Sequence, residues 1–323
     1  MKVFYTDYNY QNKEIEQKLF DAAGIEVIFA DKSLPRKDLI AFCKEADGLV
    51  TTYTVVDEEF LAGLPHLQVA VRSGIGYNTI DVEACTKRGV MVANVRNYCV
   101  EEVSDHAFAL TLTLIRKLPH FDRRVKQDHS WTVNDGRPIK RISEMTVGCY
   151  GLGAIGKEYA RKVKALGMTV SAYDPYLPDS EWNRLGIKKA ETVDALAGCD
   201  VVSIHTPLTE QTKNSIGAAF LSKMQPTAYL INVSRGGIVD ETALLEALSK
   251  KQIAGAGLDV LSSEHPDLTA PLVQLENVVI TPHVAYYSDG AERSLQELSA
   301  EQAILALTKG APEFFVNQKE LNR

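Results

Sequence analysis

Residues 146–174 read TVGCYGLGAIGKEYARKVKALGMTVSAYD, and this stretch decides the fold. The apolar run TVGCY predicts a strand, a Gly-x-Gly-x-x-Gly turn follows at residues 151–156, and KEYARKVKAL then has the pattern of a helix. A second strand, TVSAYD, ends in an acidic residue, Asp174, 23 positions after the first glycine. The stretch therefore predicts a βαβ unit of the kind that binds a dinucleotide.

Each part of this turn has a physical reason. Gly151 permits the tight turn, Gly153 lets backbone approach a pyrophosphate, and Gly156 allows the helix to pack closely on the strand. The amino terminus of the helix then faces the anion. Asp174 would accept hydrogen bonds from a ribose and repel a 2′-phosphate, which favours NAD over NADP. The alternative is a glycine turn with an unrelated aspartate.

Strand patterns recur on both sides of this unit, with sequence of helical character between most of them. Before residue 100 they are MKVFYTD, EVIFA, DGLVTTY and QVAVRS, and from residue 146 they are TVGCYG, TVSAYD, DVVSIHTP, AYLINVS, IAGAGLDV and NVVITPH. The later six predict a doubly wound parallel sheet in an α/β protein. Residues 100–126 predict one long helix with a kink at Pro119, and residues 294–310 predict an amphipathic helix that Gly310 stops.

Composition narrows the class of protein. A chain of 323 residues suits two domains, and its net charge of −7 argues against a nucleic-acid partner. No apolar run approaches the roughly 20 residues that span a bilayer, and MKVFYTDYNY lacks the features of a signal peptide, so we expect no membrane contact and a cytoplasmic protein. The five cysteines are scattered, and we interpret them as reduced and not catalytic: Cys43, Cys85, Cys99, Cys149 and Cys199. Cys149 and Cys199 stand in or beside strand patterns, where a small buried residue is ordinary.

Polar residues stand where several of the later strands end. They are His205-Thr206-Pro207, Ser234-Arg235-Gly236-Gly237, Asp259 and Pro282-His283. Because ligands gather beyond the carboxyl ends of parallel strands, we expect these residues to converge on one cleft.

Reduction of a carbonyl by hydride needs a proton donor, a cation for the substrate and a group that keeps the donor protonated. His283, Arg235 and Glu264 can fill these roles, since an imidazole titrates near neutrality and a guanidinium matches a carboxylate. Taken singly, each has a plainer interpretation as a packed or solvated side chain. His205 is the rival histidine, but its position one strand earlier suits a cofactor contact better.

These motifs resemble the D-isomer-specific 2-hydroxyacid dehydrogenase family across nearly the whole chain. NVSRGGIVDE is similar to the family's arginine segment, GLDVLSSEHP to its Asp and Glu segment, and NVVITPHVAYYS to its histidine segment. The resemblance implies an NAD-dependent enzyme that interconverts a small 2-oxo acid and its 2-hydroxy acid. In it, Arg235 binds and polarises the substrate, His283 is the acid and base, and Glu264 supports His283.

The same resemblance implies further site residues, and it implies no metal. It implies substrate contacts at Ile75, Gly76, Tyr98, Arg235 and His283, with the amides near Ile75 and Gly76 holding the carboxylate, and places Asp259 at the nicotinamide carboxamide. The cofactor contacts we expect are Gly151, Gly153, Ala154, Ile155, Gly156, Asp174, His205, Thr206, Pro207, Thr212, Val233, Ser234, Arg235, Asp259 and His283.

Within the family, NYCVEEVSDHA, the Trp131 region and TPHVAYYS look most like the subgroup similar to C-terminal-binding proteins. Two residues depart from the pattern, since Tyr286 stands where that subgroup often has Trp and His265 separates Glu264 from Pro266. An NAD-sensing corepressor is therefore the alternative from another class, although we expect no long extension after the last helix. A phosphoglycerate dehydrogenase is the alternative with the same chemistry, although we expect no regulatory domain after residue 323.

The family architecture predicts two domains with the active site between them. Residues 1–98 and 285–323 are expected to form a flavodoxin-like substrate domain, and residues 99–284 a Rossmann domain for the dinucleotide. The helix after residue 100 is expected to help build a homodimer.

Overall fold

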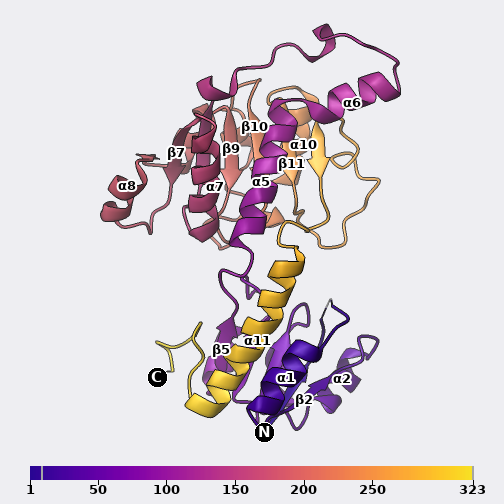
Figure 1. Ribbon diagram of the computed structural model, residues 1–323, viewed down its shortest axis with the longest axis vertical. Helices are drawn as coiled ribbons and strands as arrows, with labels where there is room; N and C mark the ends of the chain where they lie inside the picture. Colours follow the sequence, from indigo (N-terminus) through magenta and orange to yellow (C-terminus); the bar gives the residue numbers. More distant parts are fainter. Residues whose placement is uncertain (9, 322–323) are drawn as a thin grey trace. The chain divides into compact units, whose positions relative to one another are not determined.

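The computed structural model describes residues 1–8 and 10–321, and the chain divides into two compact units (Figure 1). Unit 1 contains Met1–Tyr98 and Ser288–Arg323, and unit 2 contains Cys99–Tyr287. Each unit holds one sheet, and every strand pairing within the two sheets is parallel. The predicted α/β class is confirmed.

The sheet of unit 1 has the strand order β2-β1-β3-β4-β5, which is the flavodoxin-like order. Its strands are β1 (Lys2–Tyr5), β2 (Glu26–Phe29), β3 (Gly48–Thr51), β4 (Val69–Arg72) and β5 (Met91–Asn94). The sequence patterns predicted the first four of these. They missed β5, whose four residues MVAN are buried throughout and have no polar alternation to mark them.

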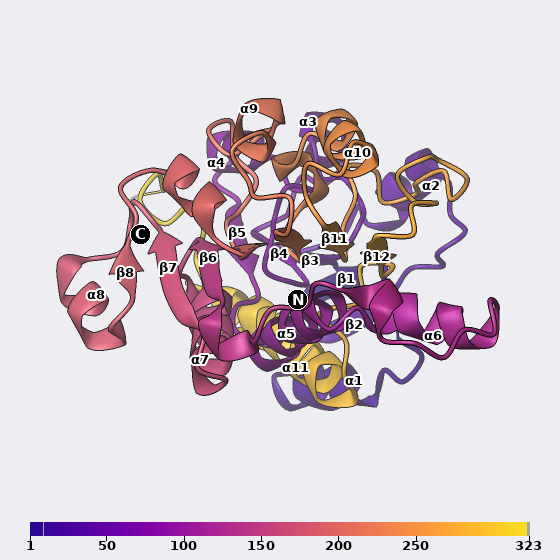
Figure 2. The ribbon, with the colours of Figure 1, turned by 90° about the horizontal axis from the view of Figure 1, so that it is seen from above.

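Helices cover both faces of this sheet (Figure 2). On one face lie α1 (Glu14–Ala22) and α11 (Asp289–Lys309), and on the other lie α2 (Arg36–Phe42), α3 (Glu58–Ala62) and α4 (Val82–Lys87). Alternate residues of a strand enter opposite cores: Val3 and Tyr5 pack with α1 and α11, and Phe4 packs with α2, α3 and α4. Unit 1 therefore has three layers.

The predicted amphipathic helix near the end of the chain is α11, and its stop at Gly310 is confirmed. Ser288 caps its first turn by accepting a hydrogen bond from the Ala291 amide. Gly310 ends the helix in the left-handed conformation at φ +82°, which a glycine adopts without strain.

The sheet of unit 2 has the order β12-β11-β10-β9-β6-β7-β8. Its strands are β6 (Thr146–Tyr150), β7 (Thr169–Tyr173), β8 (Lys188–Lys189), β9 (Val201–Ile204), β10 (Tyr229–Asn232), β11 (Gly255–Leu258) and β12 (Val278–Ile280). Counted from β6 this is the Rossmann order with one more strand at the β12 edge, so the predicted doubly wound sheet is confirmed. The sequence patterns missed only β8, because its two lysines are exposed and have no apolar signal.

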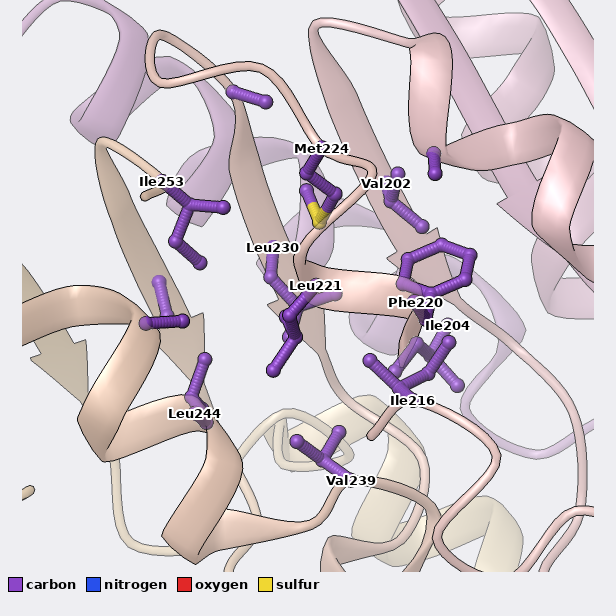
Figure 3. Close-up of a cluster of buried hydrophobic side chains, with 14 of the residues drawn as sticks. Val202, Ile204, Ile216, Phe220, Leu221, Met224, Leu230, Val239, Leu244 and Ile253 are labelled. Carbon is purple, nitrogen blue, oxygen red and sulfur yellow. The ribbon is translucent and has the colours of Figure 1, made fainter. Parts of the chain in front are cut away.

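In unit 2, α5 (Val100–Ile115) and α7 (Ala154–Ala165) cover one face of the sheet, and α9 (Ala218–Leu221) and α10 (Glu241–Ser249) cover the other (Figure 2). Figure 3 shows the core beneath α9 and α10, where Phe220 and Leu244 meet side chains of β9 and β10 such as Val202 and Leu230. The remaining elements are α6 (Leu118–Lys126), α8 (Asp179–Leu185) and the 3-10 turns η1 (Asn134–Gly136), η2 (Ile142–Glu144), η3 (Val193–Gly198) and η4 (Gly236–Ile238). Among the described residues, no helix combines the length and apolarity that crossing a membrane requires.

The prediction of one long helix over residues 100–126 is wrong. The chain breaks at Lys117, which adopts the left-handed conformation at φ +53°, and a second helix, α6, begins at Leu118. Pro119 does not kink a continuous helix; it lies in the first turn of α6, where the missing N–H leaves no carbonyl without a donor.

All five cysteines are free, as the sequence predicted, and all five are buried, as was expected of Cys149 and Cys199. Burial raises the pKa of the Cys43 and Cys85 thiols to about 12 and raises that of Cys149 and Cys199. The thiolate form, which a catalytic cysteine needs, is therefore disfavoured at each position.

The left-handed end of α11 generates a test of local conformation. Gly310→Ala should lower the free energy of unfolding by about 1–2 kcal/mol, because a Cβ there meets no atom within 4 Å and the cost is purely one of φ. Gly290→Ala in the first turn of the same helix is the matched control and should raise it by up to about 1 kcal/mol. Chemical denaturation measures both, and equal signs for the two variants would contradict this account.

Candidate active site

The parallel register aligns the carboxyl ends of five strands in unit 2. Tyr150 of β6 pairs with Ile204 of β9, Ile204 with Asn232 of β10, Asn232 with Leu258 of β11, and Leu258 with Ile280 of β12. The residues that follow each strand therefore leave the sheet side by side along one edge. The predicted site residues of unit 2 gather at this edge or in the loops that lead from it.

The glycine turn follows β6 at the point where the strand order reverses. Gly151 has φ +97°, and a Cβ on it would lie 2.6 Å from the His205 carbonyl oxygen. A Cβ on Gly156 would lie 2.3 Å from the Gly151 carbonyl oxygen. A Cβ on Gly153 would meet nothing within 4 Å, so the space above this glycine is open. Of the three glycines in this turn, Gly151 and Gly156 are thus the two that the protein's own packing requires.

The amino terminus of α7 is open to an anion. Gly153 is its N-cap and offers no side chain, and no acidic residue stands in the first turn, which contains Ala154 and Ile155. The N–H groups of this turn therefore have no capping side chain and present a partial positive charge. The turn fits the pyrophosphate of a dinucleotide.

Asp174 lies beside the glycine turn, as a ribose-binding acid would. Its carboxylate accepts hydrogen bonds from the Leu152 amide at 2.8 Å and from the Tyr176 amide at 2.9 Å. Asp174 therefore also holds the glycine turn in place. Each carboxylate oxygen keeps accepting capacity beyond these two bonds.

His205 is neutral at physiological pH. Burial lowers the pKa of its imidazole to about 3, because the charged form cannot be hydrated there. Its Nε2 lies 2.9 Å from the Ser203 hydroxyl, its ring lies 4.9 Å from that of Tyr159, and its buried Nδ1 has no hydrogen-bond partner in the protein. A histidine in this state cannot be the proton donor, which removes the rival to His283.

The remaining predicted cofactor contacts lie on the loops after β9 and β10. The Thr212 hydroxyl donates to the Pro207 carbonyl at 2.7 Å and shapes the loop that also contains Thr206. The Ser234 hydroxyl donates to the Ile204 carbonyl at 2.8 Å and ties the two strand ends together. Val233, just before Ser234, is buried.

Arg235 is half-buried at the start of η4, and its Nη1 donates to the Ser234 carbonyl at 2.7 Å. In the described part of the chain, no carboxylate forms an ion pair with it. The loop is held tightly, because a Cβ on Gly236 would lie 1.9 Å from the Leu261 carbonyl carbon. This fixes the arginine loop against the segment that leads from β11 to Glu264.

His283 and Glu264 contact each other directly. The His283 Nδ1 lies 2.9 Å from Glu264 Oε2 and 3.2 Å from Oε1, and the imidazole is 34% exposed. With Nδ1 donating to the carboxylate, Nε2 is the nitrogen left for a ligand. The His283 backbone is left-handed at φ +52°, so its turn must be held by its surroundings.

Asp259 is 1% exposed, and its carboxylate is hydrogen-bonded by residues 281–285, the turn around His283 that we call the histidine turn. Its Oδ1 accepts from the Thr281 hydroxyl at 2.5 Å and from the Val284 amide at 3.0 Å, and its Oδ2 accepts from the Ala285 amide at 2.9 Å. The predicted contact with a nicotinamide carboxamide stays a prediction, and the structure gives Asp259 a second task in shaping this turn.

Three predicted substrate residues belong to unit 1. Ile75 and Gly76 follow β4, and the Asn94 side chain braces them by donating to the Ile75 carbonyl at 2.7 Å. Tyr98 is the last residue of the first segment of unit 1. The sequence reasoning did not single out Asn94, which a strand-end search would have found had β5 been predicted.

The sequence reasoning also missed Thr281 and His106. The His106 Nε2 lies 2.8 Å from the Thr281 hydroxyl and 3.5 Å from Asp259 Oδ1. Thr281 stands directly before the Pro-His pair, so a search for polar residues at strand ends could have found it. Nothing in a helical pattern indicates that His106 of α5 contacts a residue 175 positions away, just after β12.

Together these groups can bind an anion at the glycine turn, hold a second anion with Arg235 and exchange a proton through His283. The Glu264 carboxylate lies 2.9 Å from His283 Nδ1, and among the described residues no carboxylate forms an ion pair with His205. This set of functions matches reduction of a carbonyl that lies next to a carboxylate.

Comparison with known proteins gives the family. Residues 108–285 match the family model described as the NAD binding domain of D-isomer specific 2-hydroxyacid dehydrogenase. A glyoxylate reductase of Korarchaeum cryptofilum is 36% identical over 298 residues, which cover 90% of this chain and 89% of that protein. The structure of a D-lactate dehydrogenase from Aquifex aeolicus, complexed with NAD and lactic acid, aligns with a TM-score of 0.84 at 27% identity, covering 96% of each chain.

A D-3-phosphoglycerate dehydrogenase of Archaeoglobus fulgidus is also 36% identical, over 290 residues. These residues cover 90% of this chain and 54% of that protein. This chain thus spans about half the length of the phosphoglycerate dehydrogenases that it matches.

The half-buried His205, whose Nδ1 is inaccessible to solvent, predicts a pH dependence of stability. Its folded pKa of about 3 lies below the ordinary 6.5, so the unfolded chain binds a proton that the folded chain excludes, and stability falls as pH drops from 6.5 toward 3. Between pH 6.5 and 5 the loss due to this residue is about 1.5 kcal/mol. Denaturation of His205→Asn at the two pH values should show that much less dependence than the parent.

His265→Asn is the matched control for this experiment, because His265 is exposed and lies in the same unit. It should keep the parent's dependence on pH. If His205→Asn retains the full loss of stability between pH 6.5 and 5, the burial argument fails.

Proposed function

The chain belongs to the D-isomer specific 2-hydroxyacid dehydrogenase family, and from this premise we propose that it transfers a hydride between NAD(H) and a small 2-oxo or 2-hydroxy acid. The contact between Glu264 and His283 at the carboxyl edge of the unit 2 sheet is the observation that carries the proposal. We assign Arg235, Glu264 and His283 to catalysis. The likeness to the C-terminal-binding-protein subgroup stays a prediction.

In this proposal His283 gives its proton to the substrate carbonyl oxygen as that oxygen becomes an alkoxide, and takes it back in the oxidation direction. Glu264 holds the imidazole by Nδ1, so that Nε2 faces the reaction. The carboxylate also stabilises the positive charge that the imidazolium carries before transfer.

Arg235 binds the carboxylate of the 2-oxo acid and polarises its carbonyl. The support is that no described carboxylate pairs with it, and that Gly236 presses its loop against Leu261, three residues before Glu264. A guanidinium matches the two oxygens of such a substrate, which a single ammonium cannot do.

When NAD is bound, its nicotinamide donates or accepts the hydride. We assign the glycine turn and the first turn of α7 to its pyrophosphate and Asp174 to its ribose, where the acid disfavours a 2′-phosphate. The further contacts we propose are Ala154, Ile155, His205, Thr206, Pro207, Thr212, Val233, Ser234 and Asp259. His205 suits this role because its buried Nδ1 has no partner in the protein.

We assign unit 1 to the substrate. The amides around Ile75 and Gly76 would hold the carboxylate, and Asn94 keeps this loop in shape. Tyr98 would contact the substrate as well. The relatives named above act on glyoxylate, lactate or phosphoglycerate, and small unphosphorylated 2-oxo acids are the class we propose here.

A cytoplasmic location is part of the proposal. Its support is that all five cysteines are free and buried, which suits a reducing compartment.

We also propose that the protein is a homodimer held through the segment 118–133, which we call the arm. In unit 2, α6 and the chain after it extend away from the sheet (Figure 1). Four large apolar side chains of the arm are exposed, with Trp131 88% accessible: Leu118, Val125, Trp131 and Val133. Such a group on a surface is typical of a protein interface, and a second copy of the same chain is the occupant we propose.

Activity tests the central assignment. The purified protein should oxidise NADH with at least one acid in a panel of pyruvate, glyoxylate, hydroxypyruvate and aromatic 2-oxo acids. His283→Ala should lower kcat on that acid by about 100- to 10,000-fold and leave the Kd of NADH nearly unchanged, because a proton donor is lost. Stopped-flow turnover and NADH fluorescence measure the two quantities.

His265→Ala is the control, since His265 is exposed and lies next to Glu264. It should keep most of the parent's turnover. Parent-like kcat in His283→Ala would refute its assignment, and a parent inactive on the whole panel would refute the proposed activity.

The arm generates a separate test of assembly. Trp131→Glu should raise the dissociation constant of the dimer at least tenfold, because a charge would be buried in an apolar contact. Sedimentation velocity over a concentration series measures this. Tyr176→Glu changes an equally exposed aromatic outside the arm and should leave the mass unchanged; a monomeric parent, or equal effects of the two variants, would rule out the arm as the interface.

A further inference from the structure

A chain of hydrogen bonds connects helix α5 with the turn that carries His283. His106 of α5 contacts the Thr281 hydroxyl at 2.8 Å, and this hydroxyl contacts Asp259 Oδ1 at 2.5 Å. The chain therefore joins three elements of unit 2: α5, the end of β11 and the end of β12.

The direction of these bonds follows from the chemistry of the groups. An ionised carboxylate only accepts, so the Thr281 hydrogen goes to Asp259. The Thr281 oxygen must then accept from His106, whose Nε2 carries the hydrogen. Thr281 thus uses its donor on one side and a lone pair on the other, which no apolar residue of the same shape can do.

Asp259 passes this restraint to the histidine turn. Besides Thr281, its side chain accepts from the Val284 and Ala285 amides, and its backbone carbonyl accepts from the His283 amide at 2.8 Å. Three consecutive amides, from His283 to Ala285, are therefore bound to one buried aspartate. They hold His283 in a left-handed conformation that a histidine rarely adopts.

Helix α5 is a firm base for such a restraint. It packs on β10, β11 and α7, and its Leu110 and Leu114 lie against Gly257 of β11, where a Cβ would be 3.1 Å from each. His106 stands one turn before Leu110 on the same helix. The position of His106 is thus set by the core and not by the loop that it contacts.

We propose that His106 and Thr281 are positioning residues for His283, acting through Asp259. The proposal deepens the proposed function and rests on it: the two residues contact neither substrate nor cofactor in this role, and they fix the angle at which the imidazole meets the substrate. A catalytic group that is misplaced by about 1 Å can cost a hundredfold in rate. Loss of the restraint should therefore appear in kcat.

The experiment compares Thr281→Val and His106→Leu with Thr281→Ser and His106→Gln, which keep the hydroxyl and the N–H donor. The first pair should lower kcat by about 10- to 100-fold and change the Kd of NADH far less, although Asp259 is also a proposed cofactor contact. The second pair should keep most of the parent's kcat. Because both residues act through one chain, the double variant should be no slower than the worse single variant.

Thr111→Val is the matched control. Thr111 also lies on α5, and its buried hydroxyl bonds to the Ala107 carbonyl and the Tyr159 hydroxyl without reaching the histidine turn. It should cost stability and leave kcat per folded site within about twofold. A merely structural role for Thr281 would give the same pattern as Thr111→Val.

Hydrogen exchange gives a readout that needs no activity. The Val284 and Ala285 amides should lose protection at least tenfold in Thr281→Val and keep it in Thr111→Val. Parent-like protection, or kinetic effects of Thr281→Val and His106→Leu that simply multiply, would overturn the proposal. A parent that oxidises NADH with no 2-oxo acid would defeat the proposed function instead, and hydrogen exchange would still decide whether the restraint exists.

Discussion

The in-register parallel ladder across β6, β9, β10, β11 and β12 is the constraint on which the candidate site depends. The last residues of these strands pair directly with one another across the sheet: Tyr150, Ile204, Asn232, Leu258 and Ile280. Turns that are as much as 130 residues apart therefore begin as neighbours without any direct attraction between them. A slip of one residue in any strand would turn its last side chain to the opposite face, so packing of both faces protects the alignment.

Most polar groups at this edge are satisfied by the protein itself. Asp174 holds the glycine turn, Ser234 ties β10 to β9, and Asp259 holds the histidine turn. Among the described residues, the groups at this edge that remain for a ligand include Arg235 without a carboxylate partner, His283 Nε2, the buried Nδ1 of His205 and the uncapped first turn of α7. Since buried or preorganised polar groups without partners cost free energy, these are where a ligand contributes most.

The sequence predicted what depends on local pattern. The glycine turn, the strand ends and the stop at Gly310 are each marked by a residue type that suits the local backbone, so the sequence shows where these features lie. It failed where tertiary packing decides: β5 is short and uniformly buried, β8 is two exposed lysines, and the break at Lys117 places an ordinary residue in a left-handed conformation. The contact of His106 with Thr281 spans 175 residues, and no local pattern encodes it.

The histidine turn shows why that missed contact matters. A buried carboxylate is costly unless it is hydrogen-bonded, and Asp259 at 1% exposure meets this cost with two amides and one hydroxyl. The donors and the turn are therefore interdependent. The left-handed conformation of His283 brings the amides to the carboxylate, and the hydrogen bonds to the carboxylate stabilise that conformation. Thr281 donates to Asp259 from a side chain, so a change at this residue can adjust the turn without changing the backbone.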